Sequence, residues 1–177
     1  MRVIAGELGG RRLVSARGEA TRPTADRVRE AVFSMLGDVG GLAVLDLFAG
    51  SGALGIEALS RGAARATFVE RSRRALDALR SNVDALGLEE RARVVASDAL
   101  AALRAGGTYD LVFLDPPYAM AAALAPALSR DLPAVLAPAA RVVSESDRRA
   151  PLTLALALVR ERRYGDTMIR IHETTEQ

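Results

Sequence analysis

The sequence contains no cysteine, no lysine and no tryptophan, and His172 is its only histidine. Without cysteine the chain can form no disulfide, and it offers neither a thiolate zinc ligand nor a cysteine nucleophile. A single imidazole also excludes sites that hold a metal through several histidines. We therefore expect chemistry without a bound metal, and we assign His172 no role.

Long apolar runs and aromatic side chains are also scarce. No stretch of about 18 apolar residues could cross a bilayer, and the first residues lack the apolar core of a signal peptide. These features favour a cytoplasmic protein that does not contact membranes. Aromatic residues make up 4% of the chain, so stacking surfaces for nucleobases are few.

All 24 basic residues are arginine, and the formal net charge is +2. The charge is unevenly distributed, because residues 1–33 hold seven arginines against four acidic residues. The start of the chain is therefore basic. Its guanidinium groups either contact phosphates or form an ordinary solvated surface.

The first 37 residues predict a hairpin and a helix. Residues 2–16 form two short apolar stretches around Gly9 and Gly10, the pattern of a β-hairpin. Apolar residues then follow the helical period from Ala25, so a helix should start after Thr24 as N-cap and end near Gly37. We separate residues 1–37, as an N-terminal extension, from residues 38–177 within one compact domain.

From residue 42 onward, short apolar runs alternate with amphipathic helical segments. This pattern predicts an α/β fold of the Rossmann-like type, with a mostly parallel seven-stranded sheet and helices on both faces. The last two strands are too close in sequence for a crossover helix, so they should form an antiparallel hairpin. The expected strands are residues 42–47, 66–70, 93–97, 109–115, 141–144, 152–163 and 168–173.

A glycine-rich loop follows the first of these strands and opens a helix. Gly50, Gly52 and Gly55 have the spacing of a dinucleotide-binding loop, so a nicotinamide-dependent dehydrogenase is one reading. Acidic residues at the ends of the strands favour a cationic ligand with an amino-acid portion instead. For S-adenosyl-L-methionine, Gly50 and Gly52 would admit the methionine portion, and Asp46 would orient the loop and the amino group.

Two further acids complete this predicted cofactor site. Glu70 ends the second strand and would accept both ribose hydroxyls, while Asp98 follows the third strand and would accept the adenine amino group. The alternative for Asp98 is that it only caps the helix that begins at Ala99. All these acids fall at the carboxyl ends of strands, the edge where open α/β sheets bind ligands.

The segment Asp115-Pro116-Pro117-Tyr118 follows the fourth strand. Its two prolines end the hydrogen-bond ladder and stiffen the loop, although a Pro-Pro-Tyr tripeptide alone often marks only a turn. The Asp115 carboxylate and the Pro116 carbonyl could accept both N–H bonds of an exocyclic amino group, and Tyr118 could stack on its base. We predict these three residues to be catalytic.

With these motifs, the sequence resembles the class I S-adenosylmethionine-dependent methyltransferases, and within them the RsmD family. The N-terminal segment discriminates best, because the glycine loop is general to the fold and Asp-Pro-Pro-Tyr occurs in several amino-methylating groups. The similarity includes residues 1–6, 10–13, 21–30, 46–62, 68–70, 113–118 and 164–167.

The resemblance implies methylation of N2 of a guanine in bacterial 16S ribosomal RNA, either free or in an assembled small-subunit particle, by a protein that we expect to be monomeric. It also implies that Arg22 and Thr24 lie near the cofactor or the target base. Arg2, Arg11, Arg12 and Arg22 are the expected RNA contacts. The alternatives are methylation of adenine N6 or of a protein glutamine, and a non-catalytic RNA-binding assembly factor.

Overall fold

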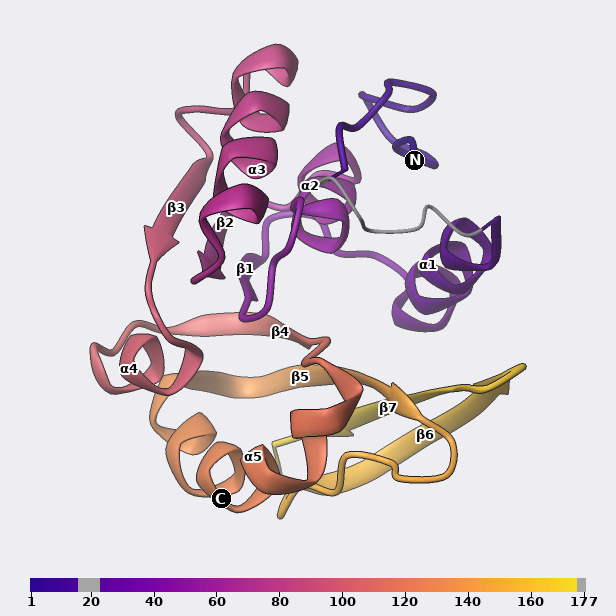
Figure 1. The fold of residues 1–177 in the computed structure, drawn as a ribbon, viewed down its shortest axis with the longest axis vertical. Helices are drawn as coiled ribbons and strands as arrows, with labels where there is room; N and C mark the ends of the chain where they lie inside the picture. Colours follow the sequence, from indigo (N-terminus) through magenta and orange to yellow (C-terminus); the bar gives the residue numbers. More distant parts are fainter. Residues whose placement is uncertain (16–22, 175–177) are drawn as a thin grey trace.

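The computed structural model describes residues 1–15 and 23–174. The helices and strands alternate along most of the chain (Figure 1). In chain order they are α1 (Pro23–Leu36), β1 (Ala43–Asp46), α2 (Ala53–Ser60), β2 (Arg65–Glu70), α3 (Arg73–Leu86), β3 (Ala92–Ala96), α4 (Ala99–Arg104), β4 (Tyr109–Leu114), α5 (Tyr118–Asp131), the 3₁₀ helix η1 (Leu132–Val135), β5 (Leu136–Asp147), β6 (Ala157–Tyr164) and β7 (Thr167–Glu173).

The strands form one seven-stranded sheet in the order β3-β2-β1-β4-β5-β7-β6. Strands β1 to β5 pair parallel with one another, whereas β7 pairs antiparallel with both β5 and β6. This arrangement confirms the predicted α/β fold with its C-terminal antiparallel hairpin. The chain builds outward from β1 in one direction and from β4 in the other, so the order reverses between these two central strands.

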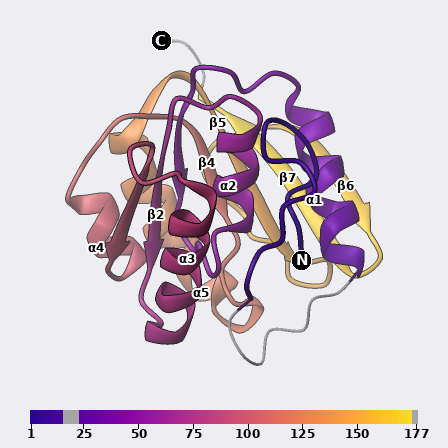
Figure 2. The same ribbon diagram turned by 90° about the horizontal axis from the view of Figure 1, so that it is seen from above.

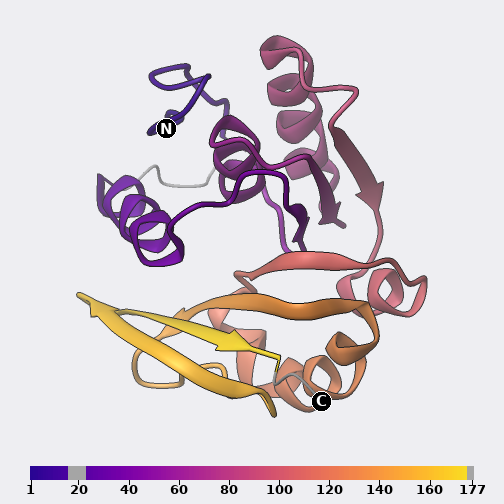
Figure 3. The ribbon, with the colours of Figure 1, turned by 180° about the vertical axis from the view of Figure 1, so that it is seen from behind.

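Helices cover both faces of the sheet. Helices α1, α2 and α3 pack on one face, with α1 over the β6–β7 end and α3 over the β2–β3 end (Figure 3). Helices α4 and α5 cover the other face. Phe33 of α1 and Phe113 of β4 are in contact in the core between the sheet and helices α1, α2 and α3, with their ring centroids 5.7 Å apart.

Two strands start five residues away from the predicted position, whereas the other strands start within one residue of it. Strand β5 starts five residues earlier than expected, across an irregularity in its pairing with β4 where Pro138 offers no N–H and Ala139 has a φ of +58°. Strand β6 starts later than expected, at Ala157. Leu152 and Leu154 precede it and are buried in the core under α4 and α5, so hydrophobic burial there replaces strand pairing.

The N-terminal segment, residues 1–15, reverses direction as predicted but forms no extended strands. Arg2 and Arg12 make one isolated antiparallel bridge, and the segment lies against α2, beside α1 (Figure 2). Val3, Gly10 and Leu13 donate across the turn to carbonyls of the same segment. Leu8 and Glu7 instead donate to α2, to the hydroxyl and the carbonyl of Ser60. Helix α1 begins at Pro23, so Thr24 lies inside the helix rather than at the predicted N-cap.

The side chain of Glu57 connects the N-terminal segment, α1 and α2. It belongs to α2 and is fully buried. Its carboxylate accepts hydrogen bonds from the backbone N–H groups of Ile4, at 2.7 Å, and Ala5, at 3.1 Å. It also pairs with Arg61, at 2.7 Å, and with Arg29 of α1, at 3.6 Å. One carboxylate thereby fixes the N-terminal segment, α1 and α2 together.

Among the described residues, no helix has both the length and the apolar character that crossing a membrane requires.

We predict that Glu57→Gln lowers the free energy of unfolding by about 3 kcal/mol, since the buried Arg29 then keeps only Asp26 as a carboxylate partner and Arg61 loses its own. Urea denaturation followed by circular dichroism measures this change. The control is Glu30→Gln on the exposed surface of α1, which should change stability by less than about 0.5 kcal/mol. Equal effects of the two substitutions would contradict the central role of Glu57.

Candidate active site

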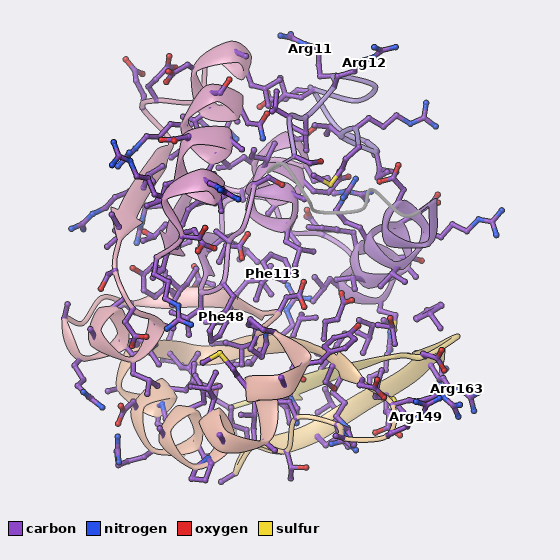
Figure 4. All side chains as sticks on the ribbon, in the orientation of Figure 1. Arg11, Arg12, Phe48, Phe113, Arg149 and Arg163 are labelled. Atoms are coloured by element: carbon purple, nitrogen blue, oxygen red, sulfur yellow. The ribbon has the colours of Figure 1, made fainter. Side chains whose placement is uncertain are left out.

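The candidate site lies where the strand order reverses, beyond the carboxyl ends of β1 and β4. The two ends are joined by the hydrogen bond from Leu47 N–H to the Phe113 carbonyl at 3.1 Å. Phe48 and Phe113, labelled in Figure 4, mark this central region of the molecule. The glycine loop after β1 and the Asp-Pro-Pro-Tyr segment after β4 therefore leave the sheet side by side.

Glycine is required in the loop for two physical reasons. Gly50 and Gly52 have φ angles of +55° and +89°, in the left-handed region that side chains disfavour. Gly55 has an ordinary φ, but an added Cβ would lie 2.3 Å from the ring of Phe68. The loop therefore turns tightly, and α2 packs close against β2.

Asp46, at the end of β1, is buried and accepts a hydrogen bond of 3.0 Å from the Gly55 N–H. The predicted contact between Asp46 and the glycine loop is therefore present. Burial raises the pKa of the Asp46 carboxyl to about 7, and the nearby charge of Glu70 adds to the rise, while the bond from Gly55 opposes it. Asp46 can thus change its charge near neutral pH.

Glu70, at the end of β2, connects the glycine loop to the start of α3. Its Oε2 accepts from the Gly50 N–H at 2.9 Å, and its Oε1 accepts from the N–H groups of Arg71 and Ser72. A carboxylate has about four acceptor positions, so this side chain keeps capacity for a further donor such as a ribose hydroxyl.

Asp98 caps α4, the alternative considered from the sequence. Its Oδ1 accepts from the N–H groups of Leu100, at 3.0 Å, and Ala101, at 3.4 Å. The other oxygen, Oδ2, lies 3.8 Å from the Arg71 guanidinium in an exposed ion pair. Capping fixes the carboxylate at the edge of the site without using its second oxygen for the helix.

The Asp-Pro-Pro-Tyr segment turns directly into α5. Asp115 is exposed and Pro116 is buried, and Tyr118 is the first residue of α5, with 42% of its surface exposed. The Tyr118 hydroxyl donates to Glu145 Oε1 at 3.5 Å and lies 3.4 Å from Thr167 Oγ1. The hydroxyl of Tyr118 therefore contacts the end of β5 and the start of β7, while part of the side chain stays exposed to solvent.

Burial raises the pKa of Tyr118, and the negative charges of Glu145, Asp115 and Asp147 add to this effect, while the Thr167 hydroxyl opposes it. Burial also raises the pKa of Glu145. The site edge near Tyr118 is therefore acidic, and the phenol stays protonated at neutral pH.

Asn82 was not identified from the sequence, although it is buried beneath the loop. Its Nδ2 donates to the carbonyl oxygens of Val14 and Ser51, at 2.9 Å each, and its Oδ1 accepts from the Val14 N–H at 2.7 Å. A polar residue among the apolar positions of α3 was the available signal. Asn82 holds the N-terminal segment against the glycine loop.

The predicted RNA-contacting arginines differ in their surroundings. Arg11 donates to the Ala85 carbonyl at 2.8 Å, while Arg2 and Arg12 are exposed. Arg11 and Arg12 project from the N-terminal segment at one end of the molecule (Figure 4). Arg22, and the side chain of Thr24, lie outside the part of the chain that can be described.

The acidic side chains at this edge fit S-adenosylmethionine. Asp46, Glu70 and Asp98 follow three neighbouring strands along one edge, with a glycine loop between them, which suits a ligand carrying an amino group, a ribose and an adenine. Within residues 1–15 and 23–174, no group of three or more acidic or histidine side chains is placed to hold a metal ion.

Comparison with known proteins agrees with this geometry. The family model described as "Conserved hypothetical protein 95" matches residues 1–173. The chain is 41% identical over 182 residues to YlbH, a candidate rRNA methyltransferase of Bacillus subtilis, and the alignment covers 98% of each protein. It is 46% identical over 120 residues to "Ribosomal RNA small subunit methyltransferase D" of Escherichia coli, covering 67% of this chain and 60% of that protein.

Solved structures share the whole fold. The structure of YhhF, a candidate methyltransferase from Escherichia coli, superposes with a TM-score of 0.85 at 36% identity, covering 100% of this chain and 99% of the other. The match extends through the N-terminal segment that distinguishes this chain within the class I fold. The chain belongs to the RsmD family of S-adenosylmethionine-dependent methyltransferases.

Proposed function

We propose that this protein methylates the exocyclic N2 amino group of a guanine in 16S ribosomal RNA. The observation that carries the proposal is the position of Asp115, Pro116 and Tyr118 directly beyond β4, beside the glycine loop that follows β1. The names of the relatives support ribosomal RNA of the small subunit as the substrate. The choice of guanine N2 rests on the resemblance to the RsmD family.

In this proposal, Asp46, Gly50, Gly52, Glu70 and Asp98 hold the cofactor, which supplies an electrophilic methyl group on a sulfonium. An exocyclic amino group is a weak nucleophile because its lone pair is delocalised into the base. The Asp115 carboxylate and the Pro116 carbonyl accept its two N–H bonds, which orients the lone pair and stabilises the positive charge that develops on nitrogen. As the N–C bond forms, the S–methyl bond would break to leave S-adenosylhomocysteine, and the nitrogen would lose one proton to Asp115 or to water.

The rigid Pro-Pro step keeps these two acceptors at a fixed separation, since each proline restricts its own φ and the conformation of the residue before it. Tyr118 stacks on the target base from the start of α5. A guanine in an unpaired or flipped-out position reaches this edge, whereas a stacked base in a duplex does not.

Asp115→Ala should lower the rate of methyl transfer by about a hundredfold or more, because one of the two acceptors for the amino group is lost. The assay transfers labelled methyl from S-adenosylmethionine to small-subunit RNA, free and protein-bound, from a strain that lacks this gene, followed by nucleoside analysis. N2-methylguanosine is the expected product.

Asp84→Ala, on the exposed surface of α3, is the control and should retain full activity. The affinity of Asp115→Ala for S-adenosylhomocysteine should remain unchanged. N6-methyladenine or a methylated protein as the product would refute the proposed substrate, and unaltered transfer by Asp115→Ala would refute the proposed site.

Tyr118→Phe and Tyr118→Ala separate stacking from the hydroxyl contacts. The phenylalanine variant keeps the ring and should retain activity within about threefold, since the lost hydrogen bonds are long and weak. The alanine variant should raise the KM for RNA by about tenfold or more, because it loses base stacking. Steady-state kinetics with RNA as the varied substrate distinguishes the two; similar kinetics for both variants would argue against stacking.

Asp46 makes cofactor binding dependent on pH. Its pKa of about 7 means that the carboxylate gains a proton as the pH falls below neutrality, and it then loses its charge toward the amino group of the ligand. Affinity for S-adenosylhomocysteine should therefore fall by up to about tenfold per pH unit below 7 and level off above 8. Calorimetric titrations at pH 6, 7 and 8 measure this, and Asp46→Asn should give a flat profile.

A further inference from the structure

A second basic region lies near the candidate site but far from the N-terminus in sequence. Residues 148–166 contain five arginines and two acidic residues. The excess of arginine over acidic residues here equals that of residues 1–33. It does not show in the net charge of the whole chain after residue 33, which is close to zero. The region includes the loop after β5, the strand β6 and the turn between β6 and β7.

The turn between β6 and β7 is connected to the candidate catalytic segment. Thr167, the first residue of β7, lies opposite Asp147 at the end of β5, and its hydroxyl is 3.4 Å from the hydroxyl of Tyr118. Glu145 of β5 contacts the same phenol. The carboxyl end of β5 and this turn therefore form the part of the site edge next to Tyr118.

The backbone of this region is firmly held. The Arg148 N–H donates to the Asp166 carbonyl at 2.8 Å, and its guanidinium pairs with the Asp166 carboxylate at 2.7 Å. The Arg149 N–H donates to Asp147 Oδ1 at 2.8 Å. The loop after β5 is thus fastened to the turn, so the side chains that it carries start from fixed positions.

Two guanidinium groups remain available on this surface. Arg149 and Arg163 are exposed and lie near each other at one end of the β6–β7 hairpin (Figure 4). Within the described parts of the chain, neither forms an ion pair, and Arg163 donates only to the Gly165 carbonyl. Both lie close enough to the Asp166 carboxylate to lower its pKa, but Asp166 is directly paired with Arg148 at 2.7 Å. The two exposed guanidinium groups therefore keep N–H donors that suit phosphate oxygens.

We propose that Arg149 and Arg163, here called the hairpin-end arginines, bind phosphates of the RNA strand next to the target nucleotide. This inference rests on the proposed function, because it assumes an RNA substrate whose base stacks on Tyr118. The acidic groups near Tyr118 repel phosphates, so the strand passes over the hairpin-end arginines while the base enters the site. Arg11 and Arg12 contact the RNA at a separate place, from the N-terminal segment.

The test compares two double variants with equal loss of charge. Arg149→Ala with Arg163→Ala removes the hairpin-end arginines. Arg65→Ala with Arg93→Ala removes two exposed arginines near the starts of β2 and β3, at the opposite edge of the sheet. Equilibrium binding to deproteinised 16S ribosomal RNA is measured at several salt concentrations, together with S-adenosylhomocysteine affinity and methyl transfer.

We expect the first variant to bind RNA about tenfold more weakly and to reduce the slope of log K against log salt by about 1 to 2, since each phosphate contact releases counterions. The KM for RNA should rise while kcat at saturating RNA and cofactor affinity stay unchanged. The second variant should behave like the wild type. Arg149→Ala alone should show about half of the change in slope, and it leaves the Arg163 hydrogen bond in the turn intact.

The outcomes separate this inference from the proposed function. If the wild type methylates the RNA and the first variant binds it with unchanged affinity and slope, the hairpin-end arginines are not phosphate contacts and the proposed function stands. Equal weakening by both variants would also overturn the inference, because it would show a general effect of charge. If the wild type neither binds nor methylates the RNA, free or protein-bound, the proposed function fails and the inference fails with it.

Discussion

The buried carboxylate of Glu57 is the constraint on which the arrangement of this protein depends. A charge at zero exposure is tolerated only when it is fully paired and hydrogen-bonded, and Glu57 meets this condition with two backbone N–H groups and two arginines. These partners come from the N-terminal segment, α1 and α2. Helix α2 begins directly after the glycine loop. The candidate site therefore lies at the start of this helix, and the N-terminal segment is bonded to its second half.

Much of the fold and of the candidate site was predictable because its signals are local. Short apolar runs and intervening amphipathic segments determine the parallel strands, and the carboxyl ends of those strands lie at one edge by geometry alone. Asp46 and Glu70 therefore take positions against the glycine loop that follow from their place in the sequence. The position of Asp-Pro-Pro-Tyr directly after β4 also follows from the sequence, because two consecutive prolines interrupt the hydrogen bonding of a strand.

The features that could not be predicted depend on partners far along the chain. Residues 1–15 keep only a short antiparallel pairing, because the N–H groups of residues 4, 5 and 8 bond to α2 more than 50 residues away. Leu152 and Leu154 have the composition of a strand but are buried in the core under α4 and α5, which come much earlier in the chain. The basic character of residues 148–166 was missed for a different reason, since averaging over a long segment cancels a local excess of charge.

The hydrogen bonds of Asn82 connect two segments that are far apart in the sequence. Its planar amide holds the carbonyl of Val14 and that of Ser51 with the same nitrogen, and it has no freedom to follow one of them without losing alignment with the other. The side chain of Asn82 therefore joins the backbone at Val14 directly to the glycine loop at Ser51. A link one side chain long thus runs between the N-terminal segment and the glycine loop of the candidate site.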